Sequence, residues 1–181
     1  MVTVRADIRV AAYDDPDAAK LIAEVQQEYV VRYGEIDTTP VEAAEFLAPR
    51  GIFLVGYLDD VPVACGAWRA HDGPAPDFRP GDAELKRMYV VPLARGRGFA
   101  RAIISELERT AAAAGRLRAV LVTGTEQPEA MALYASSGYH VIDNFGPYRN
   151  DPECRCFARA LTEVGRSMTS RSPNSPAHRR P

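Results

Sequence analysis

The chain has 181 residues, 46% of them apolar, and its 22 basic and 24 acidic residues give a net charge of −2. This size and composition suit one globular domain whose core needs neither metal ions nor disulfides, and the three cysteines show no metal-ligand spacing. No apolar run reaches the ~20 residues of a membrane span and the first residues lack a signal-peptide pattern, so we expect a cytoplasmic protein with reduced thiols.

Positive charge is concentrated at the C-terminus. Residues 165–181 contain four arginines and no acid, which leaves residues 1–164 with 18 basic and 24 acidic residues, a net charge of −6. Because this tail has almost no apolar residues to bury, we expect it to be disordered and the folded domain to span residues 1–164. An acidic body disfavours nucleic-acid binding, which needs a basic stripe.

The first elements are a strand and a helix. β-Branched residues and partial alternation predict a strand over Val4–Tyr13. Asp14 or Asp15 is placed to cap a helix with Pro16 in its first turn, and Gly34 supplies the residue that ends it.

A second helix and a hairpin follow. The run Thr39-Pro40-Val41-Glu42 has the pattern of a capping box and predicts a short helix through Leu47. Gly51–Leu58 and Val61–His71 flank the pair Asp59-Asp60, so they predict a β-hairpin with a short turn.

The central stretch reads as strand, glycine loop and helix. The strand Glu84–Val91 stops at Pro92, which cannot donate to a sheet ladder. The glycine loop, Arg95–Ala100, comes next. Apolar residues at helical spacing then run over residues 100–114, and Gly115 supplies a left-handed cap.

The last predicted elements are a strand, a helix and two further strands. Leu117–Thr123 predicts a strand, Pro128 begins a helix that Gly138 ends, and two strands are expected near residues 139–144 and 153–161. The sequence therefore predicts a mixed α/β domain with about seven strands and about four helices.

The glycine loop is a candidate phosphate site. A helix that begins on it leaves backbone N–H groups free, and Gly96 and Gly98 have no side chain to keep an anion away. Arg95 and Arg97 add positive charge, which favours a di- or polyphosphate. The alternative for the loop by itself is a strand-to-helix turn with solvent-exposed arginines.

Spacing separates the families that use such loops. The chain has no Gly-x4-Gly-Lys-Ser/Thr, and Arg101 stands where a dinucleotide fingerprint needs its third small residue. The pattern Arg/Gln-x-x-Gly-x-Gly/Ala does fit, at Arg95, Gly98 and Ala100. Downstream, Ala130–Tyr139 matches Ala-x-x-Leu-Tyr-x-x-x-Gly-Phe/Tyr.

With these two motifs the chain resembles the GCN5-related N-acetyltransferases (GNAT) over residues 4–161. The resemblance implies the GNAT fold and acetyl-coenzyme A as co-substrate, with its pyrophosphate on the glycine loop and its pantetheine along the preceding strand. Gln127 stands where many relatives carry asparagine. The residues so implied in cofactor binding are Met88, Tyr89, Val90, Arg95, Gly96, Arg97, Gly98, Phe99, Ala100 and Gln127.

Acetyl transfer to an amine requires the neutral amine, and a lysine-like amine has a pKa of ~10.4, so a base must remove a proton. Glu84 is similar to the strand glutamate that serves as base in several relatives. A strand-end carboxylate paired with Lys86 or Arg87 is its alternative role. His71 and His140 are weaker candidates.

The departing thiolate needs a proton, which a phenol held close by can donate. The resemblance gives this role to Tyr134, whose alternative is a core tyrosine with its hydroxyl in water. Tyr89, Tyr139 and Tyr148 are weaker rivals. Backbone N–H groups near Val90 are expected to polarise the thioester carbonyl.

The acceptor is predicted from charge. Residues 14–45 carry nine acids and two basic residues, a net charge of −7, so we expect direct transfer in a ternary complex to a small cationic amine. A protein N-terminal or lysine acetyltransferase and a non-catalytic acetyl-coenzyme A sensor are the alternatives. A second copy of the chain is a possible partner, whereas a membrane and a metal ion are not expected.

Overall fold

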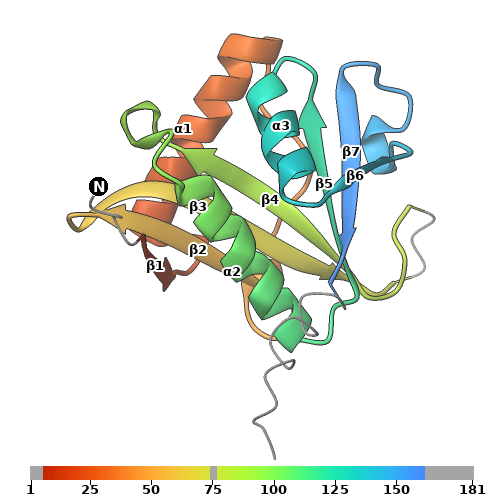
Figure 1. Cartoon of the computed structure of the whole chain (residues 1–181), viewed down its shortest axis with the longest axis horizontal. Coiled ribbons are helices and arrows are strands. Elements are labelled where there is room, and N and C mark those ends of the chain that lie inside the picture. The colour runs from red at the N-terminus through yellow and green to blue at the C-terminus, as the bar shows by residue number, and fades with distance from the viewer. Residues whose placement is uncertain (1–5, 74–76, 162–181) are drawn as a thin grey trace, which may run out of the picture.

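Seven strands form one mixed sheet in the computed structural model, which describes residues 6–73 and 77–161 (Figure 1). Their order is β1-β2-β3-β4-β5-β7-β6, and neighbours are antiparallel except for β4 and β5. The predicted fold class is confirmed, whereas the tail at 165–181 lies outside the described residues. The strands are β1 (Asp7–Val10), β2 (Gly51–Leu58), β3 (Val61–His71), β4 (Asp82–Val90), β5 (Arg118–Gly124), β6 (His140–Ile142) and β7 (Cys154–Ala160).

Helices cover both faces of the sheet (Figure 1). Leu21 of α1 packs with Phe53 on one face, whereas Ile103 of α2 and Tyr134 of α3 belong to the core on the other face, together with Trp68. In the part of the chain that the structure describes, no helix is long and apolar enough to cross a membrane. The three helices are α1 (Pro16–Tyr33), α2 (Phe99–Ala113) and α3 (Pro128–Ser136).

Local signals set the helix ends as predicted. The Asp15 carboxylate accepts the Asp17 N–H at 2.9 Å at the start of α1. Helix α2 closes on Gly115, which adopts φ +79°. Its N–H donates to Ala112 O at 3.0 Å and the next N–H, of Arg116, donates to the carbonyl of the residue before Ala112 at 2.9 Å. This pair of bonds satisfies the last carbonyls of the helix.

The predicted hairpin is present as well. Asp59 and Asp60 adopt φ of +50° and +60°, and Leu58 pairs directly with Val61. Two central residues with positive φ match the right-handed twist of the flanking strands. Aspartate tolerates this backbone conformation better than most residues.

Two predicted elements need correction. The expected helix from Thr39 to Leu47 is a short 3₁₀ turn over Ala43–Phe46, so the described residues hold three α-helices. The capping box lies three residues later than predicted, because the Glu42 N–H donates to Glu45 Oε2 at 2.9 Å. The first strand, expected over Val4–Tyr13, is described as Asp7–Val10, and residues 1–5 lie outside the described part.

Strands β4 and β5 pair only at their beginnings. The parallel register joins Asp82–Glu84 to Arg118–Val120, although β4 continues to Val90 and β5 to Gly124. Figure 1 shows the two strands parting beyond this point. The carboxyl ends of parallel neighbours are where α/β sheets place their ligands.

Candidate active site

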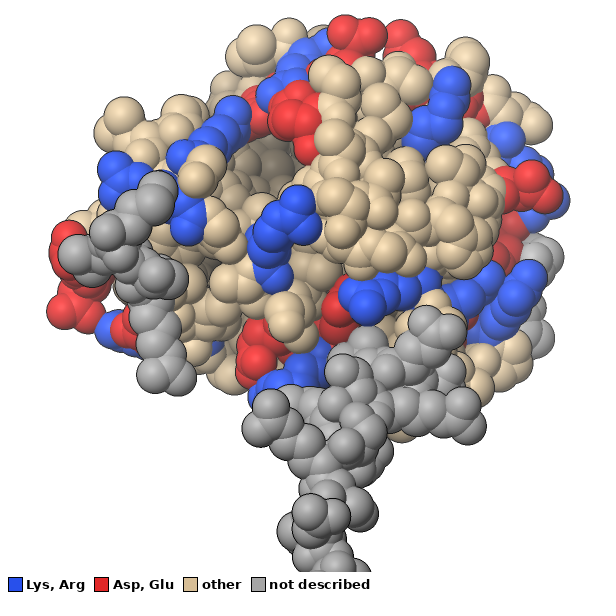
Figure 2. Space-filling view, in the orientation of Figure 1, with Lys and Arg blue, Asp and Glu red and all other residues tan. Residues whose placement is uncertain are grey.

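Two clefts lie where β4 and β5 part. One, of about 500 Å³, is lined by the glycine loop, the end of β4 and side chains of α1 and α3, and we call it the loop cleft. The other, of about 480 Å³, is lined by residues 35–40, Glu84–Arg87 and the segment before β7, and we call it the polar pocket. Figure 2 shows the surface hollowed on this side, with basic and acidic side chains at the rim.

The loop cleft collects nearly all the residues implied in cofactor binding. Arg97 is exposed and does not line it. Tyr134 lines the loop cleft, whereas Glu84 lines the polar pocket. The binding and catalytic roles of these residues stay predictions. The cofactor residues that the cleft does bring together are Met88, Tyr89, Val90, Arg95, Gly96, Gly98, Phe99, Ala100 and Gln127.

The glycine loop has the backbone of an anion site. Gly98 is the N-cap of α2 with φ +86°, and Gly96 has φ +74°. A side-chain carbon built on either glycine meets nothing within 4 Å, so the space beside the loop is open. Phe99, 2% exposed, anchors the first turn of α2 in the core. A helix N-terminus with open approach and free N–H groups suits a phosphate.

Arg95 reaches across the rim of the loop cleft. Its Nε donates to Val90 O at 2.9 Å, and its Nη2 lies 2.6 Å from Glu28 Oε2 on α1. The arginine side chain is 42% exposed. A pair this exposed contributes less than ~1 kcal/mol, so an incoming phosphate can compete for the guanidinium.

Tyr134 is built into the wall of the loop cleft. The residue is 5% exposed, and its ring packs edge-on against Tyr139 at 5.8 Å and tilted against Phe157 at 6.0 Å. Burial raises the pKa of the Tyr134 hydroxyl above its ordinary value. The hydroxyl therefore stays protonated at neutral pH and can donate a proton or a hydrogen bond.

The polar pocket carries an excess of negative charge. Its lining has five carboxylates and two cationic side chains, a net charge of −3. The cations are Lys86 and Arg87; the carboxylates belong to Glu35, Asp37, Glu84, Asp151 and Glu153.

Most acids of residues 14–45 are elsewhere. Only Glu35 and Asp37 of the nine line the polar pocket. Others are engaged away from it: Asp17 accepts from the Tyr57 hydroxyl at 2.8 Å, and Glu24 pairs with Lys20 at 2.8 Å. The negative field at the pocket therefore depends as much on Asp151 and Glu153, which lie outside the acidic segment singled out in the sequence.

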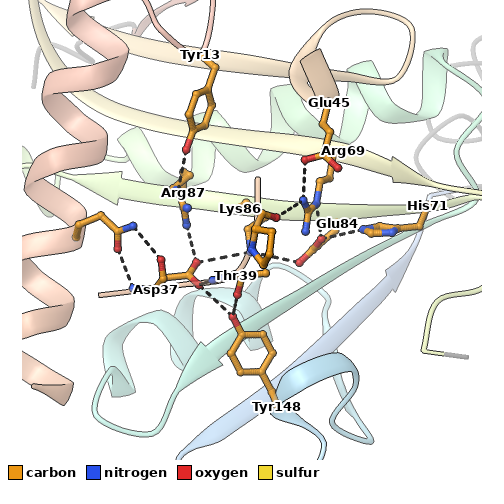
Figure 3. Close-up of polar contacts among 12 residues, drawn as sticks. Tyr13, Asp37, Thr39, Glu45, Arg69, His71, Glu84, Lys86, Arg87 and Tyr148 are labelled. Carbon is orange, nitrogen blue, oxygen red and sulfur yellow. Dashed lines mark hydrogen bonds and ion pairs between the residues drawn. The ribbon is translucent and has the colours of Figure 1, made fainter. Parts of the chain in front are cut away.

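Glu84 is the centre of a buried ion-pair network (Figure 3). The side chain is 3% exposed, and Oε2 lies 2.8 Å from Arg69 Nε and 2.8 Å from His71 Nε2, while Oε1 lies 3.5 Å from Lys86 Nζ. Burial alone would raise the pKa of Glu84, but the His71 hydrogen bond and the charges of Lys86 and Arg69 outweigh it and lower the pKa to about 2.

Asp37 forms a second centre on the facing wall (Figure 3). Its Oδ2 lies 2.6 Å from Arg87 Nη1 and 3.7 Å from Lys86 Nζ, and its Oδ1 accepts the Thr39 N–H at 2.9 Å. Burial opposes ionisation, but Lys86, Thr39 and Arg87 together hold the pKa of Asp37 well below its usual range. The Tyr148 hydroxyl donates to Oδ1 at 3.3 Å and is also bonded to the Thr39 hydroxyl, which ties the β6–β7 segment to this wall.

The two clefts meet at Tyr29 and Gln127, which are the described residues that line both. The Thr123 hydroxyl donates to Gln127 Oε1 at 3.1 Å, which fixes the orientation of the carboxamide. Burial raises the pKa of the Tyr29 hydroxyl, which keeps it a donor. The two clefts are thus neighbours, with a phenol and a carboxamide at their common boundary.

Sequence reasoning missed several of these residues. Tyr29 reads as one member of an apolar helix stripe, and Asp37 as a loop acid. Lys86 and Arg87 do leave a signal, because two adjacent polar residues interrupt the alternation of a half-buried strand. Among the described residues there is no group of three or more side chains that could hold a metal ion.

Comparison with known proteins decides the family. The model of the Acetyltransferase (GNAT) family matches residues 18–139. The chain belongs to this family. An IAA acetyltransferase of Azospirillum brasilense is 39% identical over 100 residues, and this match spans 55% of the chain and 61% of the relative. The uncharacterized N-acetyltransferase YjgM of Escherichia coli K12 is 29% identical over 141 residues, which are 75% of the chain and 81% of that protein.

Solved structures share the GNAT fold. A presumed acyl-CoA N-acyltransferase of Klebsiella pneumoniae has a TM-score of 0.68 at 26% identity. The match covers 86% of this chain and 97% of the Klebsiella chain. The PaiA N-acetyltransferase of Thermoplasma acidophilum, solved with coenzyme A, has a TM-score of 0.61 at 15% identity. This match covers 87% of this chain and 99% of the Thermoplasma chain. The second likeness, at this identity, concerns the fold alone.

Proposed function

We propose that the protein transfers an acetyl group from acetyl-coenzyme A to a primary amine. The observation that carries this proposal is the meeting of two clefts at Tyr29 and Gln127, one of them built on a GNAT glycine loop. A thioester in the loop cleft and an amine in the polar pocket would come together there, and holding two reactants in the right orientation can remove ~7–11 kcal/mol of a reaction barrier.

The loop cleft is proposed to hold the coenzyme A. The free N–H groups at Gly96 and Gly98, with Arg95, would bind the pyrophosphate. The pantetheine would pair with the backbone of Met88–Val90, which continues past the point where β4 leaves β5. An N–H near Val90 would then face the thioester oxygen as charge develops on it.

Tyr134 is the proposed acid. It lines the loop cleft, and its hydroxyl is protonated at neutral pH. Because its raised pKa makes transfer to a thiolate of pKa ~8.5 uphill, we propose that the transfer is coupled to the loss of a proton from the attacking nitrogen. In the reaction the amine nitrogen bonds to the acetyl carbon, the carbon–sulfur bond breaks, and the Tyr134 proton goes to sulfur. The proton that the nitrogen loses as it becomes an amide would return to the tyrosinate through water, so that a neutral amine and acetyl-coenzyme A give the amide and the free thiol.

Glu84 is the proposed base. With a pKa of about 2, its carboxylate accepts a proton from an ammonium of pKa ~10.4 only at a cost of roughly 11 kcal/mol, so it cannot store the proton. We propose that Glu84 passes it on, through water or through His71, whose side chain is 20% exposed and lies 2.8 Å from the carboxylate.

A small cationic amine is the proposed acceptor. The net charge of −3 on the lining of the polar pocket would raise the local concentration of cations and disfavour anionic amines. Glu35, Asp151 and Glu153 supply this excess, because the charges of Asp37 and Glu84 are met by Lys86, Arg87 and Arg69.

The experiment is a turnover assay with acetyl-coenzyme A and a panel of amines of matched size: cationic, neutral and anionic small molecules, and peptides with a free N-terminus or a lysine. Release of free thiol is the readout. We expect turnover with the cationic small amines. Turnover with the peptides alone would make the protein a protein acetyltransferase, and coenzyme A binding without any turnover would make it a sensor.

A further inference from the structure

Strand β4 contains a bulge in the middle of the candidate site. Cys65 of β3 faces Tyr89, yet two residues further along β3 Ala67 faces Lys86, so the single residue between them opposes both Arg87 and Met88. An extra residue of this kind bends a strand and re-aims its side chains, and bulges recur beside active sites.

The bulge has a clear effect on which side each residue faces. Leu85 and Met88 pack in the core under α2, while Lys86 and Arg87 both reach the ion pairs on the opposite face. In a regular strand Arg87 would face the same side of the sheet as Leu85, and its guanidinium would point into the apolar core. The extra residue therefore puts two adjacent cations on one face and returns Met88–Val90 to the correct alternation.

The backbone at the bulge is held in an uncommon state. Arg87 adopts φ +57°, which a long side chain rarely takes. Its carbonyl accepts a hydrogen bond from Cys65 Sγ at 3.1 Å. Its side chain, 3% exposed, lies 2.6 Å from Asp37 Oδ2 and donates to the Tyr13 hydroxyl at 3.4 Å (Figure 3). Such a state persists only where its surroundings enforce it.

Asp37 is itself fixed from another side. Its backbone N–H donates to Gln26 Oε1 at 2.9 Å, and its carbonyl accepts from Gln26 Nε2 at 3.2 Å. Gln26 belongs to α1, so the carboxylate that holds Arg87 is anchored to a rigid helix. The chain of contacts runs from α1 through Asp37 and Arg87 to the bulge.

We propose that Arg87 is a positioning residue. Its ion pair with Asp37 holds the β4 bulge in place, and the bulge fixes the position of Met88–Val90, which line the loop cleft, relative to the polar pocket. The effect of Arg87 on catalysis rests on the proposed function. Arg87 serves neither as acid nor as base. It fixes the strand on which the thioester would lie.

The test compares Arg87→Met with a matched control, Arg118→Met. Arg118 also pairs with a buried aspartate of β4, through Nε at 2.8 Å and Nη2 at 2.7 Å to Asp82, but this pair lines neither cleft. We expect both variants to lower the melting temperature. We expect only Arg87→Met to weaken coenzyme A binding by calorimetry, about tenfold, and to lower kcat/KM about a hundredfold, as a small misplacement does.

Two further variants complete the test. Arg87→Lys keeps the charge and should restore most of the coenzyme A affinity, and Asp37→Asn should reproduce the loss with β4 unchanged in sequence. Asp37→Asn decides the matter if Arg87→Met does not fold. Unchanged coenzyme A affinity in Arg87→Met and Asp37→Asn, or an equal loss in Arg118→Met, overturns the proposal. If the wild type binds coenzyme A but acetylates no amine, the proposed function fails while the affinity comparison still tests Arg87.

Discussion

Replacing Glu84 by glutamine tests the central carboxylate of the site. The change keeps the volume and one acceptor oxygen but leaves Arg69, His71 and Lys86 without the charge that they surround. Removing one partner of a buried ion pair costs about 3–5 kcal/mol. Because glutamine can still accept a hydrogen bond from Arg69, we expect a loss near the lower end of this range at pH 7.

The pH dependence of this loss follows from the pKa. Glu84 has a folded-state pKa of about 2 against an ordinary value of 4.5, and each pKa unit corresponds to 1.36 kcal/mol, which makes roughly 3 kcal/mol in total. The folded-state pKa is depressed, so this contribution is complete above the unfolded-state value and is lost as the pH falls from about 4.5 through 2. The wild type should therefore lose stability in this window, and Glu84→Gln should lose less.

The assay is urea unfolding at several pH values between 2.5 and 7, together with the pH profile of kcat. Glu106→Gln is the control, because its partner Arg109 lies on the same helix, α2, and the side chain is 33% exposed; it should cost less than ~1 kcal/mol. Equal acid sensitivity of wild type and Glu84→Gln would refute the low pKa. If Glu84 is the base, the variant is roughly a hundredfold slower at pH 7 and recovers as the pH rises; equal rates at neutral pH would remove it from that role.

Three other predictions follow from the same site. Gly98→Glu should abolish coenzyme A binding measured by calorimetry, because it puts a carboxylate where the phosphate would lie. The control is Gly98→Ala, which carries the same backbone strain at φ +86° without the charge. Similar coenzyme A affinities for the two variants would argue against the glycine loop as the phosphate site. Tyr134→Phe should lower kcat roughly ten- to a thousandfold with coenzyme A affinity nearly unchanged, and an unaltered kcat would rule it out as the acid. The preference for a cationic amine should fade between low and high salt, and a preferred anionic amine would contradict the charge argument.

Short-range sequence patterns predict several local structures of this chain correctly. The aspartate cap of α1, the glycine ends of α1 and α2 and the Asp59-Asp60 turn all depend on a few neighbouring residues, so their chemistry is visible in the chain itself. The capping box predicted at Thr39 is wrong for a related reason. Two overlapping stretches carry suitable residues, and the contacts of Glu42 with Glu45 select the later one.

The sequence by itself determined the family motifs, the order of the elements and most of the residues that gather in the loop cleft, because the residues of the glycine loop and of α3 lie in two contiguous stretches of chain, whereas Val25, Glu28 and Tyr29 join them from α1. Only the tertiary structure decided the polar pocket. It joins residues 35–40, strand β4 and the segment before β7, whose distance along the chain leaves no local pattern. The fate of each charge was decided there too. Although burial opposes ionisation, the His71 hydrogen bond and the charges of Lys86 and Arg69 turn Glu84 from a strand-end carboxylate into the low-pKa centre of a network, and the bulge at Arg87 selects the face on which two adjacent cations lie.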